Sequence, residues 1–400
     1  MADAPHPDVT VHAWAKRCIR VATQTVTLDR AVGRVLAQPI RADRDSPAHD
    51  VSAMDGYALR LADFDNAGRM PLAGEVTTGQ APPDLPPGHA VRIFTGGCVP
   101  KQAELVIKRE DLAETLELIE LQAPLESFKV GQHIRRRGEN AKQGDAVVPP
   151  GVALTPAVVG AAAAFGTCQP SVYRRVRVGL LTTGDELLAP DDQPEPWQIR
   201  DSNGPVIASM LQSAPWLDLT HTQRGGDNPK QLTRQLDQLL EQCDAVITTG
   251  GVSMGDHDYI PAVVRALGGE VAFHKLPVRP GKPMLGAIGP AGQPILGLPG
   301  NPVSAMATLR RFGRAALRHI AGFEQCLPPA ASVRCDPPTT NTTGLWWYQL
   351  ATIDDAGCAQ CVATRGSGDL ASAARSDGLI ELPPGTMNAT RALFHPWPLD

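Results

Sequence analysis

The spacing of apolar positions divides the chain into segments of different type. It predicts an amphipathic helix followed by a turn over residues 11–38, and a second helix over 155–166, opened by Thr155 and Pro156. Between them, from about 45 to 145, short apolar runs such as AVRIF, LVIK and LELIELQ alternate with glycine-containing turns. This alternation is typical of a small β domain, and because helical segments bracket it, we expect it to be inserted.

From residue 176 onward, strands alternate with helices. VRVGLLTTG and DAVITTGG indicate buried strands, and helices are expected over 205–212 and 259–267. PILGLPGNPVSAMATLRRF adds a strand and a helix that runs to about His319, with Asn301 as N-cap and Pro302 in the first helical position. The alternation predicts a parallel sheet covered by helices. After Pro329 the short runs LWWYQLATID, CVATRG and GLIELPPG predict one small barrel or sandwich.

Composition and charge narrow the class of protein. The 400 residues are 42% apolar and only 4% aromatic, which favours a soluble multidomain chain packed by aliphatic side chains. The net charge of −5, without a Lys/Arg-rich block, makes nucleic acid an unexpected partner. The start lacks a signal-peptide pattern, and the most apolar run, Ala157–Phe165, is too short to span a membrane, so we expect a cytoplasmic protein in which that run is a buried helix.

Cysteine usage adds one small motif. Cys358 and Cys361 are spaced as a redox pair or half of a zinc site. No second pair accompanies them in the sequence, and ordinary thiols are the favoured interpretation in a reducing compartment.

The sharpest local motif is CDAVITTGGVSMGDHDY. A buried strand ends at Thr249 and a glycine-rich loop then leads into a helix. Such a loop leaves backbone N–H groups free for an anion, with Gly250, Gly251 and Gly255 giving close approach and Ser253 adding a hydroxyl donor. A tight surface turn is the alternative, and neither the P-loop nor the G-x-G-x-x-G pattern is present.

Carboxylates follow several of the predicted strands. Glu186, Asp227 and Asp258 all belong near the carboxyl edge of the sheet, where ligands of open α/β folds bind. Each alone could be a solvated cap. Together they would repel a phosphate unless Mg²⁺ lay between, so the set predicts a magnesium–phosphate site.

Basic and turn residues supply further candidates. FHKLPVRPGKPML brings Lys275, Arg279 and Lys282 near a proline-stiffened turn, which suits an oxyanion, although a solvated basic loop is the alternative. In the inserted domain, the turns at Asp55 and Thr95 and the arginines from Arg135 are by themselves compatible with ordinary turns and a solvated surface.

Seven motifs occur together in this order: SAMDGYAL, RIFTGG, IRRRGEN, TTGDEL, TTGGVSMGDHDY, RPGKP and GLPGNPVSA. Together they resemble the molybdopterin molybdenumtransferase family, called MoeA in bacteria and the gephyrin E domain in animals. The resemblance covers nearly the whole chain. It implies a multidomain α/β plus β fold with four domains: a helical/β linker domain (1–44 and 143–174), an inserted β domain (45–142), an α/β molybdopterin/nucleotide-binding domain (175–325) and a barrel-like C-terminal β domain (326–400).

The resemblance also implies a function and a set of site residues. Mg²⁺ and adenylylated molybdopterin would bind the α/β domain, molybdate nearby, and molybdenum insertion would accompany release of AMP. The active site would lie in a homodimer, and other cofactor-assembly proteins and molybdoenzymes are possible further partners. Matching the motifs implies catalytic roles for Asp55, Thr95, Glu186, Asp227, Lys275 and Arg279. It implies ligand contacts for Gly250, Gly251, Ser253, Gly255, Lys282, Pro299, Pro302, Arg135 and Ser367, and metal contacts for Asp258, Glu186 and Asp227.

The sequence departs from the family pattern at three places, one of which, Arg279 where the family often has Lys, keeps the charge. Asn140 stands where the family commonly has Asp in RRRGED, and Gln349 aligns with an Arg in a segment like F-x-R-G. A binding or specialised paralogue that does not catalyse insertion is therefore one alternative, and the related molybdopterin adenylyltransferase, which shares the α/β module, is another.

Overall fold

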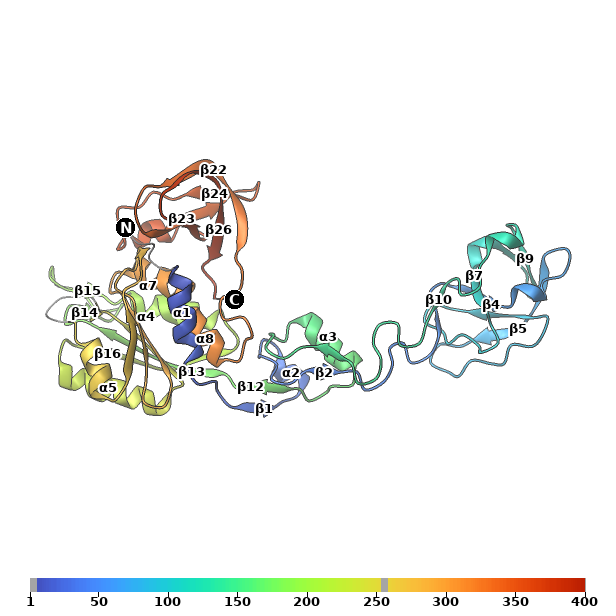
Figure 1. The fold of residues 1–400 in the computed structure, drawn as a ribbon, viewed down its shortest axis with the longest axis horizontal. Helices are drawn as coiled ribbons and strands as arrows, with labels where there is room; N and C mark the ends of the chain where they lie inside the picture. The colour runs from blue at the N-terminus through green and yellow to red at the C-terminus, as the bar shows by residue number, and fades with distance from the viewer. Residues whose placement is uncertain (1–5, 253–257, 400) are drawn as a thin grey trace. The chain divides into compact units, whose positions relative to one another are not determined.

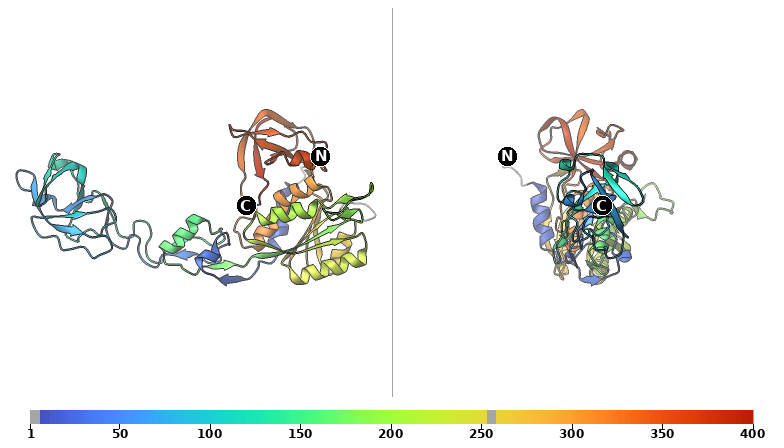
Figure 2. Two further views of the ribbon diagram at one scale, coloured as in Figure 1. Left: turned by 180° about the vertical axis from the view of Figure 1, so that it is seen from behind. Right: turned by 90° about the vertical axis from the view of Figure 1, so that its right-hand side faces the viewer.

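The computed structural model describes residues 6–252 and 258–399, and these form two compact units (Figures 1 and 2). The first unit comprises residues 1–38, 150–159 and 169–400, and the second comprises 39–149 and 160–168. The inserted β domain expected over 45–142 lies wholly within the second unit. The predicted fold class is confirmed, whereas the exact four-domain division stays a prediction.

A six-stranded sheet forms the centre of the first unit, in the order β16-β13-β17-β21-β20-β18. Four of its strands are parallel, and β20 and β18 are antiparallel additions. The strands are β13 (Val176–Thr183), β16 (Leu217–Gly225), β17 (Ala245–Thr249), β18 (Glu270–His274), β20 (Leu285–Ile288) and β21 (Pro294–Leu298). Parallel strands with both faces covered need near-continuous apolar sequence, and β17 and β21 are buried along their whole length.

Helices cover both faces of this sheet. Successive residues of a strand point to opposite faces, so Leu180 packs into one apolar cluster and Leu181 into another. The helices over the Leu181 face are α5 (Pro229–Gln242) and α6 (Ile260–Ala266). Those over the Leu180 face are α1 (Pro7–Lys16), α4 (Asn203–Gln212), α7 (Pro302–Thr308) and α8 (Arg314–Ile320). The helix predicted to reach about His319 is present, but a π-helical turn, Leu309–Gly313, separates α7 from α8.

The end of the first unit is a closed five-stranded barrel, which resolves the choice between barrel and sandwich. It closes because β23 pairs with both β24 and β25. The members are β22 (Ala331–Asn341), β23 (Trp346–Ile353), β24 (Cys358–Cys361), β25 (Gly378–Leu382) and β26 (Thr386–Pro396), with the short helix α9 (Leu370–Ala373). The strand β19 (Val278–Arg279) leaves the α/β part and pairs in parallel with β23.

The expectation of one helix and a turn over 11–38 was wrong in its extent. Helix α1 is Pro7–Lys16, and the chain then forms β1 (Thr23–Thr25) and α2 (Leu28–Ala31). The β-branched residues of VATQTVT favour extended backbone, and β1 gains a partner in β12 (Ser171–Tyr173).

Helix α3 (Pro156–Ala164) confirms the second helix but not its burial. Only Ala162 among its residues is buried, although its composition is strongly apolar. The run Ala157–Phe165 was therefore wrongly expected to be a buried helix. A helix that is apolar on all sides can bury only the side that meets its own chain.

A half-barrel sheet forms the second unit, in the order β7-β4-β6-β5-β9-β8. Its strands are β4 (Gly56–Leu59), β5 (Arg69–Val76), β6 (Ala90–Ile93), β7 (Leu105–Lys108), β8 (Leu112–Glu114) and β9 (Leu118–Leu121). Two short pairs accompany it: β2 (Ile40–Arg41) with β11 (Ala146–Val148), and β3 (Val51–Ser52) with β10 (Ile134–Arg135). Among the described residues, every helix is too short or too polar to cross a bilayer.

Candidate functional site

The first cavity lies at the carboxyl ends of β13, β17 and β21, and its volume is about 440 Å³. Its walls include Thr183, Glu186, Asp227, Gly250, Gly251, Asp258 and Pro299. We call it the glycine-loop cavity. The motifs TTGDEL, RGGDNP, TTGG and GLPGN, far apart in the sequence, are thus brought to one place, as the parallel sheet predicted.

Two glycines allow the loop to close over the strand end. Gly250 has φ +84° and Gly251 φ +64°, and a Cβ on Gly250 would lie 2.7 Å from the Thr183 carbonyl oxygen. Both the conformation and the close approach exclude side chains here. Ser253 and Gly255, the other predicted members of the loop, lie outside the described residues.

Three carboxylates share the cavity with this loop. Glu186, Asp227 and Asp258 line it, while Asp185 accepts a hydrogen bond from the Asp227 N–H at 3.0 Å and so fixes that turn. In the described part of the chain, no group of three His, Cys, Asp or Glu side chains is arranged to hold a metal ion. The three carboxylates therefore line one cavity without forming a metal cage of their own.

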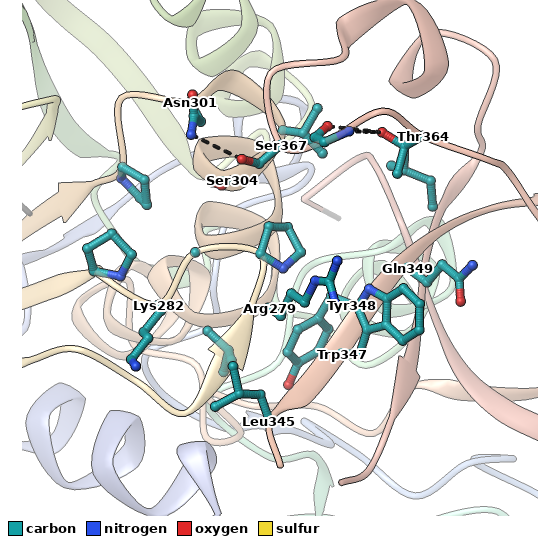
Figure 3. Close-up of a pocket in the computed structure, with 18 residues that line it drawn as sticks. Arg279, Lys282, Asn301, Ser304, Leu345, Trp347, Tyr348, Gln349, Thr364 and Ser367 are labelled. Carbon is teal, nitrogen blue, oxygen red and sulfur yellow. Dashed lines mark hydrogen bonds between the residues drawn. The ribbon is translucent and has the colours of Figure 1, made fainter. Parts of the chain in front are cut away.

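The second cavity lies between the α/β part and the barrel, within the first unit, and its volume is about 470 Å³ (Figure 3). We call it the basic cavity. Arg279 and Lys282 line it together with Trp347, Gln349, Thr364 and Ser367. The Arg279 guanidinium lies 5.1 Å from the centroid of the Trp347 ring, a cation–π contact that holds its long side chain.

Asn301 joins the two cavities. It was predicted as an N-cap, and it does occupy that position before α7, but its side chain makes no capping hydrogen bond. Instead its Nδ2 donates to Ser367 Oγ at 3.0 Å, which ties the barrel loop to the α/β part (Figure 3). Asn301, Pro299 and Pro283 line both cavities, so the two are neighbours with a common wall.

Two further predicted residues of the first unit, Lys275 and Pro302, are not among the residues that line either cavity. Lys275 is exposed with φ +91°, and its backbone N–H donates to the Met284 carbonyl. Pro302 begins α7.

The second unit holds its own group of predicted residues. Both the N–H and the hydroxyl of Thr95 donate to Asp55 Oδ1 at 2.8 Å. These two bonds lower the pKa of the Asp55 carboxyl, and the backbone bond has the larger effect. Arg135 donates to Glu139 at 3.2 Å and to Asn140 Oδ1 at 2.6 Å, so Asn140 still accepts a bond from Arg135.

Gln349 occupies a wall of the basic cavity, and its Oε1 is buried without a hydrogen-bond partner among the described residues. The cysteines of the small motif are free thiols: Cys358 accepts a bond from Arg334 Nε at 3.0 Å and Cys361 contacts Thr339. Spaced three apart on β24, the two side chains point to opposite faces of the strand.

Sequence reasoning missed several lining residues. Trp347, Thr364 and Ile199 line the cavities but lie outside the recognised motifs. The pair Trp346–Trp347 was a usable signal, since the chain has only 4% aromatic residues.

Known proteins match this chain over most of its length. Residues 9–166 match the family described as the MoeA N-terminal region (domains I and II), and residues 179–319 match the probable molybdopterin binding domain. A molybdopterin molybdenumtransferase of Synechococcus elongatus is 37% identical over 328 residues, covering 78% of this chain and 80% of that protein. Molybdopterin molybdenumtransferase 2 of Mycobacterium tuberculosis is 33% identical over 372 residues, covering 90% of both.

A solved structure has the same fold. The molybdopterin biosynthesis moeA protein from Pyrococcus horikoshii OT3 aligns with a TM-score of 0.81 at 24% identity, covering 98% of this chain and 99% of that chain. On the evidence of the sequence matches, the chain belongs to the molybdopterin molybdenumtransferase family.

Proposed function

We propose that this chain completes molybdenum-cofactor assembly by Mg²⁺-dependent insertion of molybdate into adenylylated molybdopterin, with release of AMP. The observation that carries the proposal is the pair of adjoining cavities. One is lined by glycines and carboxylates and the other by cations and an aromatic ring, and they share Pro283, Pro299 and Asn301. A substrate with a nucleotide at one end and a pterin dithiolene at the other matches this pair.

The nucleotide end belongs in the glycine-loop cavity. Backbone N–H groups at a strand-to-helix turn favour phosphate, whereas Glu186, Asp227 and Asp258 repel it. A divalent cation resolves the conflict, and Mg²⁺ usually takes one or two carboxylates plus substrate phosphates rather than an all-protein cage. The carboxylates of this cavity fit that requirement. When bound, Mg²⁺ would offset the phosphate charge while water cleaves the phosphoanhydride bond.

Molybdate belongs in the basic cavity. Arg279 and Lys282 offer two cations, and Ser367 and Thr364 offer hydroxyl groups to an oxyanion. The Trp347 ring holds Arg279 before any ligand arrives, which lowers the entropy lost on binding. Lys275 and Pro302 complete the set of proposed positions in this unit.

We further propose that the protein is a homodimer. The inserted β unit of one copy would supply Asp55, Thr95 and Arg135 to the site of the other. The exposed apolar helix α3 supports association, because an apolar surface of this kind is stabilised when a second copy covers it. Val158→Glu is expected to yield a monomer in analytical ultracentrifugation, and a wild-type monomer at micromolar concentration would refute the dimer.

The reaction itself is the main test. Purified protein is incubated with adenylylated molybdopterin, molybdate and Mg²⁺, and AMP and active cofactor are measured. We expect both products, each dependent on Mg²⁺. No release of AMP under conditions in which a known family member succeeds would refute the proposal. Production of adenylylated molybdopterin from molybdopterin and ATP would instead identify an adenylyltransferase.

A cofactor-binding protein without insertion activity is the second candidate, and it is favoured by Gln349, which lines the basic cavity and aligns with an Arg of the family. Gln349→Arg and Asn140→Asp restore the charges that the family commonly has. If these changes raise turnover strongly while ligand affinity was already normal, the natural protein is a binder. In either case we place the protein in the cytoplasm, where other cofactor-assembly proteins and molybdoenzymes would be its partners.

A further inference from the structure

An exposed tryptophan lies two residues along the chain from Ile199, which lines the glycine-loop cavity. We call residues 189–198, which connect β14 (Leu187–Leu188) to β15 (Ile199–Arg200), the tryptophan loop. Trp197 in this loop is 74% exposed, and its neighbour Ile199 is 55% exposed. Figure 1 shows β14 and β15 next to each other at the end of the α/β sheet. A solvent-exposed indole is thus two residues from the wall of the cavity.

Backbone bonds fix the base of the loop to the cavity wall. The Ile199 N–H donates to the Glu186 carbonyl at 2.9 Å, and the Asp201 N–H donates to the Leu188 carbonyl at 2.8 Å. The buried Asp201 in turn accepts from Thr182 Oγ1 at 2.8 Å, at the end of β13. The loop therefore connects two paired strands, and Asp201, directly after β15, bonds the end of β13.

One side of the cavity wall is apolar and the other is polar. Leu187 and Ile199 form an apolar side, while Glu186, Asp227 and Asp258 form the polar side. Such a wall suits a ligand with an anionic end and a flat apolar end. None of the described lining residues is aromatic, and Trp197 is two residues from the lining residue Ile199. Two residues span at most about 7 Å of extended chain, which is within reach of a bound base.

We propose that Trp197 stacks on the adenine ring of the nucleotide and thereby selects a nucleotide over a bare phosphate ester. The inference rests on the proposed nucleotide site and adds a specificity residue to it. With the phosphate at the glycine loop, the base lies along the apolar side formed by Leu187 and Ile199. The indole then covers the outer face of the ring and loses solvent exposure in doing so.

The experiment compares two probes on the full chain. AMP with Mg²⁺ and ribose 5-phosphate with Mg²⁺ are titrated calorimetrically into wild type, Trp197→Ala and Trp197→Phe. Stacking on one base corresponds to a loss of about 5-fold to about 150-fold in AMP affinity for Trp197→Ala. Ribose 5-phosphate affinity stays unchanged, and Trp197→Phe keeps most of the AMP affinity.

Met387→Ala is the matched control, because Met387 is a large apolar side chain that is 66% exposed on β26. It should leave both affinities unchanged. The high exposure of Trp197 means that its removal leaves no core cavity, and equal thermal unfolding temperatures of all variants verify this.

The outcomes separate the two proposals. If wild type binds AMP and Trp197→Ala binds it equally well, the stacking inference is overturned while the nucleotide site stands. An equal loss of AMP and ribose 5-phosphate affinity also overturns it, because the indole would then act on the phosphate site. If wild type binds neither probe, the nucleotide site is refuted and the stacking inference with it.

Discussion

Arg311 donates from Nε to Glu381 Oε2 over 2.8 Å, and both side chains are less than 10% exposed. The same guanidinium pairs with Asp8 at 2.7 Å, while His395 Nε2 lies 2.9 Å from the same Glu381 oxygen. Arg311 lies in the π-helical turn, Asp8 on α1 and Glu381 on β25. One buried charge network therefore connects the N-terminal helix, the α/β part and the barrel.

Replacing Glu381 with Gln should destabilise the first unit strongly. Removing one partner leaves Arg311 buried with less compensation, which typically costs about 3–5 kcal/mol. Although burial alone would raise it, the bond to His395 and the charge of Arg311 lower the pKa of Glu381 to about 2. The stabilisation is therefore complete above about pH 4.5, the ordinary Glu range, and is lost as the pH falls toward about 2.

Denaturant unfolding at pH 7 and pH 3 measures this effect. Glu270→Gln is the control, because Glu270 pairs with Arg17 at 2.5 Å in solvent, with 61% and 48% of the side chains exposed. An exposed pair contributes about 0–1 kcal/mol. If Glu381→Gln and Glu270→Gln lost the same free energy of unfolding, burial would not be what makes the Glu381 pair important.

Because of His319, the folded protein should become less stable in mild acid. Its burial first, and then the charges of Arg20 and Lys16, lower its pKa to about 4. The unfolded chain binds the proton near pH 6.5, so stability is full above that pH and decreases as the pH falls from about 6.5 to about 4. His319→Gln should make the unfolding midpoint less dependent on pH in this range, whereas the control substitution of the partly exposed His89, His89→Gln, should not. The lowered pKa of His395 acts in the same direction and leaves a residual slope.

Replacing Gly250 with Ala should abolish nucleotide binding. A Cβ there would lie 2.7 Å from Thr183 oxygen atoms, and φ is +84°. Gly268→Ala is a close match, since φ is +81° but nothing lies within 4 Å of its Cβ. Both variants pay the strain of a left-handed residue, about 1 kcal/mol or more, so the difference between them measures the close approach alone. AMP titration and thermal unfolding of both variants test this, and equal AMP affinities would contradict it.

Asp258→Asn should weaken the binding of Mg²⁺ more than the binding of AMP. The loss of a metal contact is expected to raise the Mg²⁺ concentration for half-maximal AMP release by at least about 10-fold. Excess Mg²⁺ should partly restore the rate. Asp237→Asn, on the exposed side of α5, should behave as wild type. An unchanged Mg²⁺ requirement in Asp258→Asn would remove this residue from the proposed metal contacts.

Strands β13 and β17 could be predicted because they are nearly continuous apolar runs that end next to a glycine. The ends of β17 at Thr249 and α4 at Gln212 agree with the sequence pattern. The convergence of TTGDEL and TTGG followed from the geometry of parallel strands, which places their carboxyl ends together.

Other features depend on partners distant in sequence. The side chain of Asn301 bonds Ser367, 66 residues away, instead of capping α7. Strand β1 is fixed by pairing with β12 rather than by its local pattern. Helix α5 was overlooked although its buried leucines at 232, 236, 239 and 240 follow helical spacing. The residues of this helix are polar on average, and this concealed the apolar stripe.

Strand β19 has a mechanical consequence for the basic cavity. Val278 and Arg279 leave the α/β part and pair residue for residue with Trp346 and Trp347 of the barrel. The cation and the ring that holds it are therefore on one hydrogen-bonded ladder and move as a single body. The barrel cannot swing away to widen the cavity while Arg279 stays behind. Any opening of the basic cavity for the proposed substrate would either break this ladder or carry Arg279 away from Lys282, which couples substrate entry to the spacing of the two cations.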